Sequence, residues 1–194
     1  MKLREKKAAK KKEEILRSAS KIISRRGYEG ATMEDIAAEL LMTKGALYYY
    51  FASKEELLYE CHTLILSEAS KKLEDIYEAE TSSIEKMKRA ITFHIEIAIT
   101  EKETFNMIIK PGLTFSDEHI SMILKQRDEY AGIFDKIIQQ GMERGEFTVQ
   151  EKKMARMIIL GAMNWIQQWY SPKGDKNKDE IANAYADYLL KMLT

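Results

Sequence analysis

The residues of this sequence best suited to chemistry lie within TKGALYYYFASKEEL, residues 43–57, where three tyrosines and a phenylalanine follow one another. A buried helix seldom carries three adjacent phenolic hydroxyl groups, because each needs a hydrogen-bond partner. At a surface, tyrosine hydroxyls and lysine ammonium groups can donate to phosphates, and tyrosine rings can pack on sugars and thymine methyl groups. The stretch therefore favours contact with a nucleic acid. An aromatic helix in the core of an ordinary bundle is the alternative.

The other polar side chains form no recognisable catalytic or metal-binding pattern. His62, His94 and His119 lie far apart, and none has the spacing of a metal motif such as H-x-x-x-H. There is no glycine-rich phosphate loop, and no Ser or Asp stands near a His in a known catalytic order. We therefore expect neither an enzyme nor a bound metal or cofactor. Cys61, the single cysteine, excludes an internal disulfide and fits a small buried side chain in a reducing compartment.

The charge distribution supports a polyanionic partner. Residues 1–54 carry 13 Lys and Arg against 7 Asp and Glu, a net charge of +6, whereas residues 55–194 carry 18 against 24, a net charge of −6. A basic end on a neutral chain indicates docking on a polyanion, and a solvated basic tail is the alternative. No segment reaches the roughly 18 apolar residues of a membrane span, and the basic start lacks the apolar stretch of a signal peptide. We expect a cytoplasmic protein with no membrane segment.

The elements that position these residues should almost all be helices. Only 2 Pro and 9 Gly interrupt the chain, no stretch shows strand alternation, and apolar residues recur at helical spacings. The expected helices span residues 8–26, 33–40, 44–50, 54–77, 82–100, 102–110, 117–143, 149–170 and 178–193. Gly27 and Gly145 should end helices, and Pro111-Gly112 should separate two of them. The expected N-caps are Thr32, Thr43, Ser53 and Thr148, with Glu151 completing a capping box at the last of these.

Two of these helices form a helix-turn-helix pattern next to the basic arm. They are short and are joined by the tight turn Leu41–Thr43. On the second helix, Leu47 and Phe51 lie four residues apart and can face the core. The side chains that then point outward, where the helix can enter a DNA major groove, are Lys44, Tyr48 and Tyr49.

In order, spacing and residue type, T-M-E-D-I-A followed by K-G-A-L-Y-Y-Y-F-A-S-K-E-E-L-L resembles the TetR family of bacterial transcriptional regulators over residues 12–60. The resemblance implies an all-α homodimer with about nine helices in each chain. Residues 1–53 would form the DNA-binding domain, and residues 54–194 a helical ligand-binding and dimerisation domain. The groove-facing positions are held by Lys44, Gly45, Ala46, Tyr48 and Tyr49, with Thr43 at the start of the same helix. The phosphate-contacting positions are held by Thr32, Tyr50 and Lys54.

One position departs from the family pattern. Leu41 stands in the turn where the family usually has Gly. If the turn needs a positive φ, Leu41 is strained by about 1 kcal/mol or more. Otherwise the turn has a different geometry, and the second helix lies at a slightly altered angle.

Methionine and aromatic residues of the C-terminal part are suited to line a cavity for a small apolar effector, because Met packs adaptably. Plain core is the alternative for each of them, and His94 is either a satisfied interior residue or a polar anchor for the ligand. The predicted cavity residues are Phe93, His94, Phe105, Met107, Tyr130, Phe134, Met163 and Asn164. Because each buried CH₂ contributes about 0.8 kcal/mol, we expect first a long-chain acyl-CoA or fatty acid, and second a planar aromatic or drug-like compound.

A stripe of small and aromatic residues precedes Pro172 and continues on the last helix. Small residues permit close helix approach and two Trp supply large apolar area, so we predict a homodimer interface; burial within one subunit is the alternative. The predicted interface residues are Ile158, Gly161, Ala162, Trp165, Trp169, Ile181, Tyr185 and Tyr188. The ending W-Y-x-P also resembles a TetR branch that includes acyl-CoA-responsive regulators of lipid degradation.

These expectations combine into one function. We predict a homodimeric repressor that binds a palindromic operator in double-stranded DNA and releases it when a small apolar effector binds. Two alternatives come from other classes. One is a constitutive DNA-binding protein with a solid core, and the other is a helical carrier or enzyme for lipid-like molecules.

Overall fold

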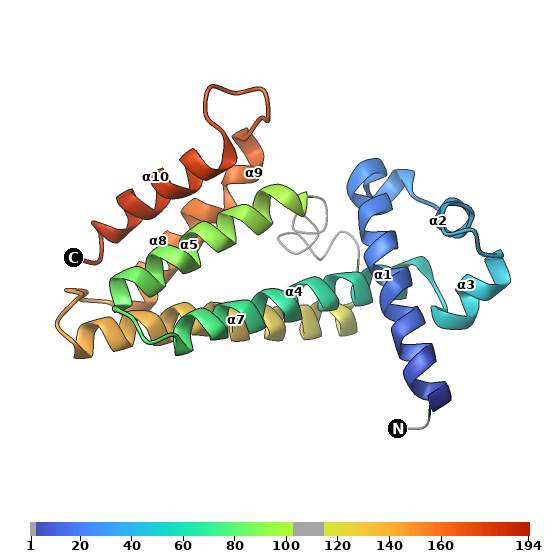
Figure 1. Ribbon diagram of the computed structural model, residues 1–194, viewed down its shortest axis with the longest axis horizontal. Helices are drawn as coiled ribbons and strands as arrows, with labels where there is room; N and C mark the ends of the chain where they lie inside the picture. Colours follow the sequence, from blue (N-terminus) through green and yellow to red (C-terminus); the bar gives the residue numbers. More distant parts are fainter. Residues whose placement is uncertain (1–2, 103–114) are drawn as a thin grey trace. The chain divides into compact units, whose positions relative to one another are not determined.

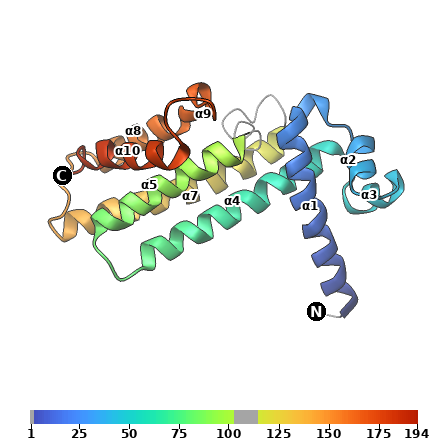
Figure 2. The same ribbon diagram turned by 45° about the horizontal axis from the view of Figure 1, so that its top comes forward.

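The computed structural model describes residues 3–102 and 115–194, and every regular element in these ranges is an α-helix (Figure 1, Figure 2). The helices are α1 (Leu3–Gly30), α2 (Met33–Glu39), α3 (Lys44–Tyr50), α4 (Lys54–Glu78), α5 (Ser83–Thr100), α7 (Asp117–Glu143), α8 (Lys152–Asn164), α9 (Ile166–Trp169) and α10 (Lys178–Leu190). The predicted all-α class is confirmed, with nine helices in these ranges. The predicted helix 102–110 and the Pro111-Gly112 break lie outside the described residues, apart from Lys102.

Residue contacts divide the described helices into two compact units. The first comprises residues up to 65 together with 115–123, and the second comprises residues 66–102 and 124–194. Helices α1, α2 and α3 therefore belong to the first unit, α5, α8, α9 and α10 belong to the second, and α4 and α7 contribute to both. Among the helices that the structure describes, none combines the length and the apolar character needed to cross a lipid bilayer.

The core of the first unit forms where α1, α2 and α3 turn their apolar sides toward one another. Ile15 of α1, Ile36 of α2 and Leu47 of α3 are all buried, as is Phe51, which ends α3. The inward side predicted for α3 is therefore confirmed. Each such side chain contributes about 1.5–3 kcal/mol on burial. Cys61 is buried in the same core, as predicted, and burial raises the pKa of its thiol to about 12.

Side-chain caps begin the short helices at the predicted residues. Thr32 Oγ1 accepts a hydrogen bond from Asp35 N at 3.1 Å, and the Asp35 carboxylate accepts one from Thr32 N at 3.2 Å. Thr43 and Ser53 cap α3 and α4, each accepting from the backbone N–H three residues later at 3.1 Å. One cap typically stabilises a helix by about 1 kcal/mol, so these caps fix where α2, α3 and α4 begin.

Both glycines predicted to end helices take a left-handed conformation that breaks the helix. Gly27 interrupts α1 with a φ of +73°, and Gly145 follows α7 with a φ of +70°. Glycine adopts this left-handed region without the steric cost that a Cβ atom brings. Leu41, in the turn between α2 and α3, has a φ of +53° although it is not glycine. The turn therefore does need a positive φ, which decides between the two alternatives left open by the sequence.

Helix α5 is the centre of the second unit, because it packs along α10 and also contacts α8 and α9. Its buried side includes Met87, Ile91 and Ile95, which are spaced four residues apart. Its first turn is capped twice. Ser82 Oγ accepts from Glu85 N at 3.2 Å, and the Glu146 carboxylate from the α7–α8 loop accepts from the N–H of Ser83 and of Ile84.

The prediction of one continuous helix over residues 149–170 is wrong, because the structure has two helices in this range. Helix α8 ends at Asn164 and the short helix α9 begins at Ile166. At this point Gln168 N donates to Trp165 O at 3.0 Å. This hydrogen bond spans three residues, as in a 3₁₀-helix, and winds the backbone more tightly than an α-helix. The interruption turns the end of the predicted helix into a separate element.

Two predicted helix boundaries in this unit are also wrong. Thr148 does not form a capping box with Glu151, because Thr148 N donates to Leu193 O at 2.6 Å and α8 begins later, at Lys152. Glu151 holds the N-cap position but makes no side-chain cap hydrogen bond. Helix α10 ends at Leu190 instead of 193, since the chain closes in three-residue turns such as Leu193 N to Leu190 O at 2.9 Å.

Candidate DNA-binding surface and ligand-binding regions

The outer side of α3 is polar, aromatic and exposed. Burial of Leu47 and Phe51 turns the opposite side of this helix to solvent, where Tyr49 is 79% exposed and Tyr48 is 40% exposed. Tyr50 is half-buried, and its ring meets the ring of Tyr49 edge-on with 5.2 Å between centroids. The predicted outward orientation is confirmed for Tyr48 and Tyr49, whereas Tyr50 packs partly against the core. Three adjacent hydroxyls are accommodated because none of the rings is fully buried.

The start of α3 carries little bulk, which leaves its backbone approachable. Thr43 and Gly45 are exposed, Ala46 is half-buried, and a Cβ atom added at Gly45 would meet nothing within 4 Å. Of the predicted phosphate contacts, Thr32 is exposed at the start of α2 and Lys54 is half-buried at the start of α4. Helix N-termini and exposed hydroxyls are both suited to phosphate oxygens.

Lys44 does not stand alone on this surface. Its ammonium group pairs with the carboxylate of Glu34, on α2, and lies 5.7 Å from the ring centroid of Tyr48. The hydrogen bond between them raises the pKa of Lys44 and lowers the pKa of Glu34. The sequence analysis did not predict that Glu34 pairs with Lys44. The signal that could have indicated it was an acidic residue two positions after Thr32, a predicted phosphate contact.

Two arginines of α1 brace α2 through ion pairs. Arg26 pairs with Glu39 at 2.6 Å and with Asp35 at 3.4 Å, and Arg25 pairs with Glu39 at 2.7 Å. Exposed pairs of this kind contribute little stability individually, but several charges sharing partners restrict geometry. The end of α1 and the first half of the helix-turn-helix are thereby tied together.

His94 lies at the centre of a buried hydrogen-bonded cluster in the second unit. Its Nδ1 is 3.0 Å from the hydroxyl of Tyr130, on α7, and its Nε2 is 3.1 Å from Oδ1 of Asn164, on α8. The ring of Phe134 meets the His94 ring edge-on at 6.2 Å between centroids, and Met163 is fully buried. Three of the predicted cavity residues, Tyr130, Phe134 and Asn164, thus meet around His94.

Burial keeps the His94 ring neutral, because it lowers the pKa to about 4. Since the side-chain oxygen of Asn164 can only accept, His94 donates through Nε2. Nδ1 is then the acceptor for the Tyr130 hydroxyl. Both ring nitrogens are satisfied, so the structure agrees with the reading of His94 as a satisfied interior residue.

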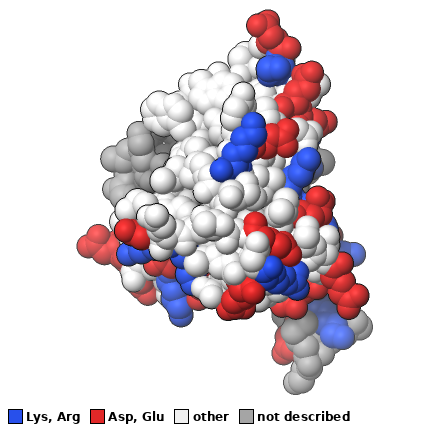
Figure 3. Space-filling view, turned by 90° about the vertical axis from the view of Figure 1, so that its left-hand side faces the viewer, with Lys and Arg blue, Asp and Glu red and all other residues white. Residues whose placement is uncertain are grey.

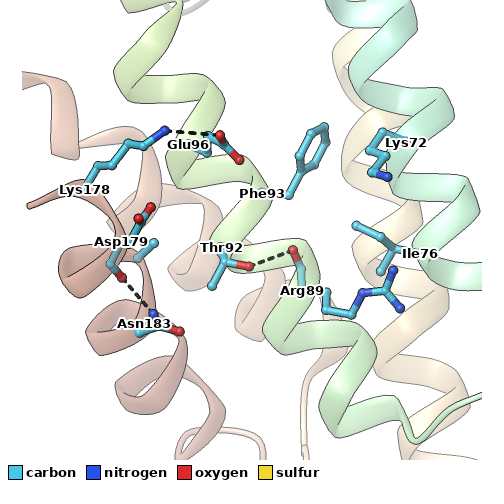
Figure 4. Close-up of a pocket in the computed structure, with 10 residues that line it drawn as sticks. Lys72, Ile76, Arg89, Thr92, Phe93, Glu96, Lys178, Asp179 and Asn183 are labelled. Atoms are coloured by element: carbon cyan, nitrogen blue, oxygen red, sulfur yellow. Dashed lines mark hydrogen bonds and ion pairs between the residues drawn. The ribbon is translucent and has the colours of Figure 1, made fainter.

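The remaining predicted cavity residues lie elsewhere. Phe93 is half-buried and lines a surface groove over α5 together with residues of α4 and α10 (Figure 4). His94 does not line this groove, since consecutive residues on a helix point about 100° apart, and a shared role of Phe93 and His94 in ligand binding stays a prediction. Phe105 and Met107 lie outside the described residues. Within residues 3–102 and 115–194, no group of three potential ligands is placed to hold a metal ion.

The part of the chain from α8 to the C-terminus exposes many large apolar side chains. Trp165 is 65% exposed and Tyr188 is 73% exposed. The others in this set, which we call the α8–α10 face, are Met154, Met157, Ile158, Trp169 and Met192. Figure 3 looks onto the side where α10 and the C-terminus lie in Figure 1, and it shows a broad uncharged area with charged side chains along its margins. Such a surface is typical of an interaction site.

The predicted interface residues differ in their exposure. Gly161 is exposed, Ala162 is half-buried, and Tyr185 is half-buried and stacks on Trp169 with 6.3 Å between centroids. Ile181 is only 6% exposed, because it packs inside the chain. This burial agrees with the alternative of burial within one subunit, and a role of Ile181 between subunits stays a prediction.

A capped helix-turn-helix joined to a larger helical unit defines a DNA-binding regulator with a separate C-terminal domain. Two family models match the chain and support this class. Residues 15–61 match the bacterial regulatory proteins of the tetR family, and residues 80–193 match the tetracyclin repressor-like C-terminal domain. The chain belongs to the TetR family of transcriptional regulators, as the helix-turn-helix motif indicated.

Similar proteins are regulators of the same family. The transcriptional repressor KstR2 of Mycolicibacterium smegmatis is 23% identical over 96% of this chain and 92% of that protein. The TetR-family regulator PfmR from Thermus thermophilus is 29% identical with a TM-score of 0.80, over 93% of this chain and 98% of that one. AibR, solved in complex with isovaleryl coenzyme A and operator DNA, is 23% identical with a TM-score of 0.76, over 94% and 97%.

Proposed function

We propose that this regulator is a homodimeric repressor of the bacterial cytoplasm that binds a palindromic operator through residues 1–53. Residues 54–194 would bind the effector and form the dimer. The observation that carries the proposal is the side of α3 that exposes Lys44, Tyr48 and Tyr49 while Leu47 and Phe51 are buried. Caps at Thr32 and Thr43 hold this helix in a defined turn, so one surface of fixed shape is offered to the major groove.

The α8–α10 face supports the proposal that the protein is a dimer. In a twofold interface the same apolar surface of both subunits is buried together. Trp165 and Tyr188 are the anchors we expect at its centre, because large aromatic side chains contribute most to such interfaces. Ile181 is not one of these anchors, since it is buried within its own chain.

The effector proposal starts from the cluster around His94. An apolar guest that enters between α5, α7 and α8 would have to displace Phe134 or Met163 and would meet the Tyr130 hydroxyl and the Asn164 amide as polar partners. AibR binds both isovaleryl coenzyme A and operator DNA. A long-chain acyl-CoA or fatty acid is accordingly the first effector to test, and a planar aromatic compound is the second.

Selection from a random pool of duplex DNA tests the repressor proposal without knowledge of the operator. We expect enrichment of an inverted repeat whose half-sites lie about one helical turn apart, roughly 34–36 Å. Tyr49→Ala should weaken binding to the operator and leave the salt slope unchanged, because the lost side chain carries no charge and releases no counterion. Lys44→Ala should instead relax preference at one base pair, which corresponds to about 1–3 kcal/mol.

Lys125→Ala, an exposed lysine of α7, is the matched control and should bind like the unchanged protein. If neither Tyr49→Ala nor Lys44→Ala differs from this control, the α3 surface is not the DNA-binding surface. If no sequence is enriched while the protein retains acyl-CoA, it is a lipid carrier or an enzyme. Effector release is measured by adding acyl-CoAs of rising chain length to the operator complex, and DNA binding that stays unchanged at every length rules them out.

A further inference from the structure

A groove of about 400 Å³ runs over α5 in the second unit (Figure 4). Its lining follows helical spacing. Lys72 and Ile76 are one turn apart on α4, and Arg89 and Phe93 are one turn apart on α5. The other side of the groove belongs to α10. A volume of this size falls within the range of pockets that hold small molecules, about 300–1,000 Å³.

The positive charges of the groove are not equally available. On the α10 side, Lys178 pairs with Glu96 at 3.3 Å, so its charge is matched and α10 is linked to α5. On the α4 side, Lys72 and Arg89 are exposed, and no carboxylate in the described part of the chain pairs with either of them. Figure 4 shows both side chains on the same side of the groove as Ile76. This side therefore offers two cations to an anion.

The floor of the groove is apolar between these charges. Phe93 is half-buried in it, and Ile76 and Ala182 are buried. A ligand that filled the groove would place apolar atoms against these three side chains. The planar guanidinium of Arg89 suits a carboxylate or a phosphate in a two-bond contact, and the ammonium of Lys72 adds a point charge.

We propose that this groove binds a small organic anion, in which a carboxylate or phosphate group is joined to a short apolar chain. The anionic group lies between Lys72 and Arg89, and the chain lies on Phe93 and Ile76. The site is separate from the His94 cluster, because Phe93 and His94 point to different sides of α5. It lies wholly within the second unit, so its test is independent of DNA binding.

Isothermal titration calorimetry with three probes of equal chain length tests the site. Hexanoate supplies a carboxylate, hexyl phosphate supplies a phosphate, and 1-hexanol supplies the chain without charge. We expect at least one anion to bind with a dissociation constant on the order of 1 mM or tighter, and 1-hexanol to bind about tenfold more weakly or not at all. Whichever anion binds more tightly identifies the headgroup.

Two charge-removing variants locate the binding. Arg89→Gln should weaken the preferred anion about tenfold, and Lys72→Gln several-fold. Lys71→Gln is the matched control, because Lys71 is the exposed neighbour of Lys72 on α4 and does not line the groove. Thermal melts establish that each variant is folded, and if Arg89→Gln is not, Lys72→Gln decides. The proposal is overturned if neither anion binds at about 10 mM, if 1-hexanol binds as tightly, or if the folded groove variants bind like Lys71→Gln.

Discussion

The ammonium of Lys44 and the carboxylate of Glu34 form an ion pair that joins α3 to α2 on the surface proposed to contact DNA. While this pair persists, one of the three donors of the Lys44 ammonium is occupied and its charge is balanced, which weakens any contact of Lys44 with a base edge or a phosphate. Both side chains are more than half exposed, at 60% and 56%, so the pair is open to screening by salt and to exchange for a DNA acceptor. Glu34 would then remain as a negative charge close to the phosphates.

Removal of this carboxylate should therefore strengthen binding without regard to sequence. In Glu34→Gln, Lys44 is available to any phosphate and the repulsion is gone. We expect tighter binding to random duplex, a salt slope steeper by about one unit, and a smaller ratio between operator and random affinity. Fluorescence anisotropy between about 50 and 200 mM salt measures all three. Glu118→Gln, an exposed acid of α7, is the control, and random-duplex affinity equal to this control contradicts the prediction.

Replacement of Leu41 by glycine should stabilise the protein. Leu41 has a φ of +53° and is 96% exposed, so it carries backbone strain and buries almost nothing. Relief of about 1–2 kcal/mol of strain, less the greater freedom of glycine in the unfolded chain, leaves a net gain of about 0.5–1 kcal/mol. Urea unfolding measures the gain. Leu41→Ala retains the strain and should unfold at nearly the same urea concentration as the unchanged protein. A Leu41→Gly protein less stable than Leu41→Ala would show that Leu41 is not strained.

The helix-turn-helix could be predicted from sequence because local chemistry decides it. Thr32, Thr43 and Ser53 cap the helices that follow them, and Leu47 and Phe51 lie on one side by spacing alone. Contacts between residues distant in sequence could not be predicted in the same way. The hydrogen bond from Thr148 N to Leu193 O displaced the expected capping box, and it joins residues that no local pattern relates.

The candidate ligand sites show the same limit. The sequence placed Phe93 beside His94 in one cavity because both lie on α5, but their side chains point to different neighbours. Which side of α5 faces α7 and α8, and which faces the groove, depends on how the helices pack. Apolar composition alone does not carry that information.

Introduction of a charge into the α8–α10 face should prevent dimer formation. Trp165→Glu places a carboxylate in the proposed interface, where two copies would bury it without a partner. Sedimentation analysis should show a folded monomer or aggregate, with operator affinity reduced because the two half-sites no longer act together. The control is Leu124→Glu, at an exposed apolar residue of α7, which should remain a dimer. A Trp165→Glu dimer that binds the operator would place the interface elsewhere.

Acid should destabilise the protein through His94. The pKa of this buried ring is about 4, below the 6.5 of an ordinary histidine. As the pH falls below 6.5 the unfolded chain binds a proton that the folded chain excludes, so stability is complete above this pH and decreases toward pH 4. The expected loss is on the order of 3 kcal/mol. Urea unfolding at several pH values measures the slope, and His94→Gln should flatten it between pH 6.5 and 4. Equal slopes for both proteins would mean that other groups dominate.

The hydrogen bonds that link Tyr130, His94 and Asn164 have a consequence for spectroscopy. Because the neutral ring carries its proton on Nε2, nitrogen magnetic resonance should show one protonated and one bare ring nitrogen for His94 across the neutral pH range. Any guest that separates the ring from Tyr130 or Asn164 must change the environment of one specific nitrogen. The two nitrogen signals would thus report whether a ligand breaks the hydrogen bond to Tyr130 or the one to Asn164, in a sample that contains no DNA.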